Sequence, residues 1–165
     1  MTDKEVLFDY RLKEAEETRA EAEEMLKGAF SSRAIVNRAY YAMFYALHAL
    51  FLKTGIRIKT SKHKGLMSEF DRVFVKTGKI DKRYSTMLHS TFNLRQEGDY
   101  KDLIQIPREE AEQAVLNARG ISRCNQAVHL FAKLTRPRRD AVFRAPVIQL
   151  CSPDTGFLTF TLHLY

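Results

Sequence analysis

The longest hydrophobic run in the chain extends from Arg33 to Leu52, and sixteen of its twenty residues are apolar or aromatic. No glycine or proline interrupts the run, and alanine, which has the highest helix propensity, occurs in it five times. A helix that is apolar on nearly every side belongs in the interior of a helical bundle. The pattern therefore predicts a central helix with Ser31 or Ser32 as its N-cap. The run is too short, and too often interrupted by polar residues, to predict a membrane span.

Helical spacing of apolar residues predicts four further helices around this one. They cover residues 3–27, 62–76, 81–97 and 107–123, and the last of these patterns is compatible with an extension to Leu134. Gly28, Gly78 and Gly98 follow three of the segments, and we expect them to end those helices. Residues 56–61 alternate apolar and basic side chains. No partner strand is evident, so we expect a loop there.

The composition changes after residue 124. Residues 125–165 contain only two acidic residues and three of the four prolines of the chain. Within this stretch, residues 157–164 have the pattern of a β segment. We therefore expect two parts, a helical domain over residues 1–124 and an appended tail over residues 125–165 that is irregular or partly β.

The net charge of +7 is unevenly distributed. Residues 1–27 carry nine acids and five bases, whereas residues 53–83 carry ten bases and three acids. A basic segment beside an acidic helix suits phosphates or nucleic acid, although a solvated lysine surface gives the same pattern. Two cysteines are too few for a disulfide framework or a zinc site. The acidic, amphipathic start does not resemble a secretory signal, so we expect a cytoplasmic protein. We also expect neither a metal nor another cofactor.

The polar residues of the central run are grouped on one side of the predicted helix. At about 100° per residue, Asn37, Tyr41 and His48 fall within roughly 60° of one another, and Phe44 lies among them. Buried polar groups need hydrogen-bond partners. This stripe is therefore expected to face a polar group of another helix, a second subunit or a ligand, and a histidine and tyrosine satisfied within the core would give the same pattern.

Arg95 is the notable polar residue of the fourth predicted helix. It lies within roughly 20° of Tyr84 and Leu88 on the helical wheel, so its side chain points toward the core or an interface. A guanidinium in such a place is either paired or available to an anion. Asp99 and Tyr100 follow at the helix end as candidate partners. A purely structural link between Arg95 and Asp99 that pins the helix end is the alternative.

Common catalytic motifs are missing, since the sequence has no glycine-rich phosphate loop, HExxH, CxxC or GxSxG pattern. What it does contain is NRAYYAMF from Asn37 to Phe44, SKHKG over 61–65, FVKTG over 74–78 and LRQEGDY from Leu94 to Tyr100. In these segments, and in helix order, residues 3–124 resemble the HEPN domain family in its small prokaryotic branch. The resemblance implies an all-α, antiparallel four- to five-helix bundle that forms a homodimer. It also implies a minimal nucleotidyltransferase as partner in a toxin–antitoxin pair.

Active members of this family cut RNA without a metal through an Arg-x4–6-His motif, with the motifs of two subunits meeting at the dimer interface. Arg95 matches the motif arginine, but Tyr100 stands where the histidine would be, and no histidine occurs from 96 to 106. A tyrosine with a pKa near 10 is a poor base at neutral pH. His48 is the better substitute, because His89 lies about 120° from Arg95 on its helix. The resemblance also makes Tyr100 a candidate acceptor of AMP from the partner.

The sequence thus predicts a module that binds a nucleotide or RNA. We expect Asn37, Tyr41, Arg95 and Asp99 to line the binding groove. A metal-independent endoribonuclease that uses Arg95, with Tyr100 or His48 in proton transfer, is the alternative.

Overall fold

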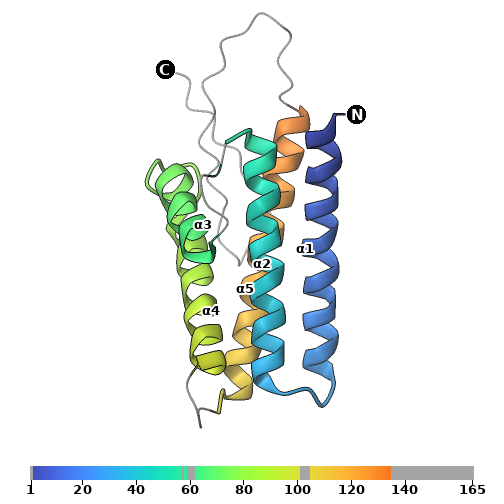
Figure 1. Ribbon diagram of the computed structural model, residues 1–165, viewed down its shortest axis with the longest axis vertical. Helices are drawn as coiled ribbons and strands as arrows, with labels where there is room; N and C mark the ends of the chain where they lie inside the picture. The colour runs from blue at the N-terminus through green and yellow to red at the C-terminus, as the bar shows by residue number, and fades with distance from the viewer. Residues whose placement is uncertain (1, 57, 59–61, 101–104, 135–165) are drawn as a thin grey trace, which may run out of the picture.

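The computed structural model describes residues 2–56, 58, 62–100 and 105–134, without the side chains of Tyr100 and residues 125–134. The described residues form five α-helices and one π-helical turn, and no strand (Figure 1). In chain order these are α1 (Asp3–Lys27), α2 (Ser32–Thr54), α3 (His63–Phe70), the π-helical turn η1 (Asp71–Val75), α4 (Lys82–Tyr100) and α5 (Arg108–Leu134). The expected all-α helical bundle is confirmed. The predicted tail over residues 125–165 falls largely outside the described part, so the division at residue 124 stays a prediction.

The central position of α2 is confirmed. In Figure 1, α2 lies between α1 and α4, and α5 packs behind it; α2 and α5 run opposite to α1 and α4. Small residues occupy the contacts, which lets the helix backbones approach closely. At most 1% of the surface is exposed for Ala15 and Ala22 of α1, Ala39, Ala42, Ala46 and Ala49 of α2, and Ala111, Ala114 and Ala118 of α5.

The ends of α2 follow from two local signals in the sequence. The Ser31 hydroxyl accepts a hydrogen bond from the backbone N–H of Ala34, 3.3 Å away, as predicted for the N-cap. At the other end Gly55 adopts a left-handed conformation with φ of 70°, which glycine reaches without steric penalty.

Two helix boundaries differ from the predicted ones. The segment predicted as one regular helix over 62–76 changes at Asp71 into a π-helical turn. The helix predicted to end before Gly98 continues to Tyr100. Gly98 is buried, and a Cβ atom built there would lie 2.8 Å from Cδ1 of Ile106. The glycine thus allows close packing of Ile106 against α4 instead of ending the helix, a role that spacing alone does not reveal.

A membrane-spanning helix would need a longer, more apolar segment than any that the described residues form.

Candidate anion-binding site

Arg95 lies near the C-terminal end of α4 with only 12% of its side chain exposed. One helical turn later, Asp99 offers Oδ2 at 3.1 Å from Nη2 of Arg95. The Nε atom of Arg95 is buried and has no hydrogen-bond partner among the described residues. Unpaired buried donors are rare in folded proteins. Within the described part of the chain, the guanidinium therefore keeps a donor without a partner.

Two tyrosines of α2 form the other wall around this guanidinium. Its Cζ atom lies 5.3 Å from the ring centroid of Tyr40 and 5.3 Å from that of Tyr41. Both distances are in the range of cation–π contacts, which stabilise the positive charge of an arginine that is shielded from water. Because Tyr40 is completely buried, the contact fixes Arg95 against the centre of the bundle.

The carboxylate of Asp99 is shared by two arginines. Nε of Arg33, at the start of α2, lies 3.5 Å from Oδ1 of Asp99, and 62% of the Arg33 side chain is exposed. Gly98 contributes to this arrangement, since its missing Cβ would lie 3.4 Å from Cγ of Arg33. Two guanidinium groups on one carboxylate leave the cluster with a surplus positive charge, which favours an anion.

His63, the first residue of α3, joins this cluster from a different part of the chain. Its Nδ1 atom lies 2.7 Å from the Tyr40 hydroxyl. Its ring centroid is 4.3 Å from that of Phe44 and 5.9 Å from that of Tyr41. Burial, followed by the charge of Arg95, holds the pKa of His63 below its ordinary value. Burial also raises the pKa of Tyr40, although Arg95 opposes this, so the phenol keeps its proton.

Sequence reasoning missed both His63 and the part played by Tyr40. His63 lies in the SKHKG segment over 61–65, which carried part of the family resemblance and was the available signal. Tyr40 lies at the edge of the polar stripe, about 40° from Phe44 and about 60° from Asn37 on the helical wheel, so the wheel was the available signal for it.

The structure separates the members of the predicted polar stripe on α2. Tyr41 contacts Arg95, and Asn37 lies one turn earlier and is partly buried. The ring of His48 packs 4.6 Å from Phe44, on a part of α2 near Arg11 of α1. Burial first, then the charges of Arg11 and of His63, lower the pKa of His48. His63 therefore lies closer to the Arg95 cluster than the predicted substitute base His48 does.

The remaining predicted residues are placed only in part. Tyr100 ends α4, and its side chain lies outside the described residues, so its proposed roles stay predictions. His89 pairs with Asp71 of η1, with 2.7 Å between Nε2 and Oδ2. Among the residues with described positions, no three His, Cys, Asp or Glu side chains come together as a metal site.

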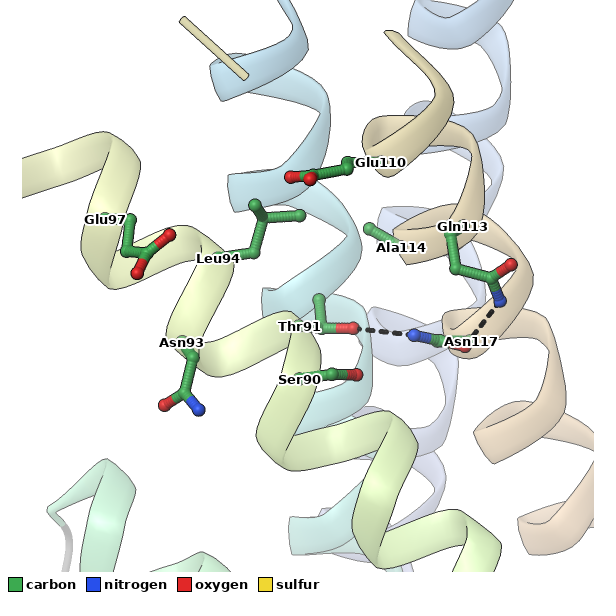
Figure 2. A pocket seen from close by; sticks show the side chains of 9 residues that line it. All are labelled: Ser90, Thr91, Asn93, Leu94, Glu97, Glu110, Gln113, Ala114 and Asn117. Carbon is green, nitrogen blue, oxygen red and sulfur yellow. Dashed lines mark hydrogen bonds between the residues drawn. The ribbon is translucent and has the colours of Figure 1, made fainter. Parts of the chain in front are cut away.

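A hollow of about 310 Å³ lies between α4 and α5 (Figure 2). Figure 2 shows a hydrogen-bond chain along its wall, in which Gln113 donates to Asn117 at 3.0 Å and Asn117 donates to Thr91 at 3.1 Å. Glu97 and Glu110 add two carboxylates to the lining. This hollow is therefore poorly suited to an anion, and the Arg95 cluster remains the candidate site.

The chain belongs to the HEPN domain family, because the profile of that family matches residues 8–133. A protein of Thermotoga maritima named "UPF0332 protein" is 37% identical over 120 residues, which cover 73% of this chain and 89% of that protein. A protein of Methanocaldococcus jannaschii named "Putative toxin MJ0142" is 37% identical over 102 residues, 62% of this chain and 68% of the other. A second from that organism, "Putative toxin MJ0605", is 34% identical over 84 residues, 51% of this chain and 60% of the other.

Proposed function

We propose that this HEPN protein is a toxin-like module that binds the phosphate of a nucleotide or an RNA at Arg95. The observation that carries the proposal is the largely buried guanidinium of Arg95. Its Nε donor has no partner among the described residues, and the carboxylate beside it is also neutralised by Arg33. Arginine suits phosphate because its planar group presents several donors in a fixed arrangement.

Aromatic side chains beside the arginine favour a nucleic-acid ligand over a free anion. Tyr41, Phe44 and Tyr45 are partly exposed along α2, and neighbouring ring centroids among them are 6.1–6.4 Å apart. Unpaired bases stack on such rings, and positive charge beside them holds the backbone.

The biological setting of the proposal comes from the family. Two relatives carry the printed name "Putative toxin". The chain belongs to the HEPN family, for which we expect a homodimer and a minimal nucleotidyltransferase as partner. Sedimentation of the purified chain, alone and with a nucleotidyltransferase encoded beside it, tests both assembly steps. A chain that stays monomeric and ignores such a partner would remove this part of the proposal.

The phosphate-binding step is tested with a fluorescent single-stranded RNA and a nucleotide competitor. We expect Arg95→Ala to weaken binding about tenfold or more, and Arg95→Lys to weaken it less, since a charge-assisted hydrogen bond contributes about 1.5–3 kcal/mol. Arg119→Ala is the matched control, because it removes the same charge from a half-exposed arginine of α5 that pairs with Glu23 of α1 and not with Asp99. Equal affinities for wild type and a folded Arg95→Ala variant would refute the proposal.

A metal-independent endoribonuclease is the second candidate. It is favoured by a histidine, His63, whose lowered pKa keeps it neutral at pH 7 within the Arg95 cluster. RNA cleavage in EDTA that disappears in Arg95→Ala supports the enzyme. A folded dimer that binds RNA without cleaving it supports the binding module.

Tyr100 as an AMP acceptor is a separate part of the proposal. Its backbone directly follows Asp99, so a modification there would alter the charge at the Arg95 cluster. Mass spectrometry after incubation with ATP and the nucleotidyltransferase would show one added AMP, absent in Tyr100→Phe. Modification of another residue would exclude this role.

A further inference from the structure

We propose that His63 is a second phosphate contact of the Arg95 site, and that it takes up a proton when the phosphate binds. The inference rests on the proposed phosphate binding at Arg95 and extends it to a residue of α3 outside the family motif. It gives the site a dependence on pH that Arg95 alone would not have.

The first argument is that His63 and Arg95 border the same two rings. The Tyr40 centroid lies 5.3 Å from Cζ of Arg95 and 5.5 Å from the ring centroid of His63. For Tyr41 the corresponding distances are 5.3 Å and 5.9 Å. The two donor groups come from α3 and α4. Tyr40 is buried, so the partly exposed ring of Tyr41 is the surface that both groups border. A phosphate beside Tyr41 can accept hydrogen bonds from both.

The second argument concerns the orientation of the imidazole. The Tyr40 hydroxyl is protonated and lies 2.7 Å from Nδ1, so it can donate a hydrogen bond to Nδ1. The hydrogen of the neutral imidazole then resides on Nε2, the nitrogen left for a ligand. Tyr40 thus acts as a positioning residue, because it fixes both the tautomer and the orientation of His63.

The third argument is electrostatic. Among the described residues, the groups that face His63 are uncharged aromatic rings of α2, one cation of α4 and a second histidine of α2. They are Tyr40, Tyr41, Phe44, Arg95 and His48. In the free protein burial, and after it the charge of Arg95, opposes protonation of His63. A bound phosphate compensates the charge of Arg95 and attracts a proton to Nδ1 of His63, after which the Tyr40 hydroxyl rotates and its oxygen accepts a hydrogen bond from Nδ1–H. By linkage, the affinity must then decrease as the pH rises.

The experiment measures binding of the full chain to a short oligouridine between about pH 5.5 and pH 7.5, since neither phosphodiesters nor uracil titrate there. We expect wild-type affinity to drop about fivefold to tenfold over this range, as a pKa change of about one unit is a tenfold effect. The substitution His63→Gln should remove most of the pH dependence. His89→Gln is the matched control, because His89 pairs with Asp71 away from the cluster.

A second readout follows the histidines of the wild-type chain directly. Histidine resonances of the wild-type chain are titrated by NMR with and without saturating oligouridine, and His63 is assigned by its loss in His63→Gln. The pKa of His63 should rise on binding. A His63 whose pKa does not move, or a His63→Gln variant with a wild-type pH profile, overturns the inference.

The outcomes separate the inference from the proposed function. If Arg95→Ala weakens binding and His63→Gln leaves the pH profile intact, phosphate binding stands and the role of His63 is refuted. If neither substitution alters binding, both proposals fail.

Discussion

Asp99 accepts two guanidinium groups that differ sharply in burial. Arg33 is mostly exposed, whereas Arg95 is enclosed by α2 and α4. Exposed ion pairs contribute little to stability because water competes for both partners. A buried guanidinium that loses its carboxylate keeps a desolvated charge without compensation. The pair of Asp99 with Arg95 therefore stabilises the fold, whereas its pair with Arg33 mainly balances charge.

For single residues, we predict that substitutions at Asp99 and at Arg33 lower the free energy of unfolding by different amounts. Replacing Asp99 by Asn should lower the free energy of unfolding by about 1–3 kcal/mol, because a buried charged donor loses its ionic partner. Arg33→Ala should change it by less than about 0.5 kcal/mol. Urea unfolding of both variants, followed by circular dichroism, measures the difference. Similar losses in the two variants would show that burial of Arg95 does not matter here.

Some helix boundaries depend on neighbouring residues in the sequence, and others depend on packing against distant parts of the chain. The start of α2 at Ser31 and its end at Gly55 depend on neighbours along the chain, and the sequence predicts both. The π-helical turn η1 depends on packing, since its Phe74 is buried in the core cluster and its Asp71 pairs with His89 of α4. Apolar spacing over 62–76 indicates a helix but does not distinguish a regular helix from a π-helical turn.

The left-handed end of α2 gives a prediction at the element scale. Gly55 has φ of 70° and open space around its Cα, so an added side chain meets only conformational strain. We expect Gly55→Ala to lower the free energy of unfolding by about 1 kcal/mol. Gly55→Asn should cost less, because asparagine tolerates this conformation better. A Gly55→Ala variant as stable as wild type in thermal melts would contradict the assigned backbone conformation.

The whole molecule carries two partly buried histidines with lowered pKa values, His48 and His63. Each binds its proton more readily in the unfolded chain, where the pKa is about 6.5. Their contribution to stability is therefore complete above about pH 6.5 and is lost as the pH falls through that value toward the folded pKa. Glu23, whose pKa is also lowered, from 4.5, changes protonation in a more acidic range.

We thus predict that the protein is less stable at about pH 5 than at about pH 7.5, and that a double variant His48→Gln/His63→Gln loses less stability over this interval. Urea unfolding at the two pH values measures both effects. If the double variant showed the wild-type decrease, the pH dependence would have to come from other groups.

The sequence by itself determined the helices, their order, several of their ends and membership in the HEPN family. These properties follow from apolar spacing, capping residues and motifs that each extend over a few residues. The helical wheel also predicts that the Arg95 side chain points inward and that Asp99, one helical turn later, lies beside it. Only the tertiary structure decided what surrounds the guanidinium. Tyr40 and His63 are 55 and 32 residues away in the sequence, and a helical wheel gives the direction of a side chain but not the helix that it meets. That pairing follows from the packing of α3 and α4 against α2.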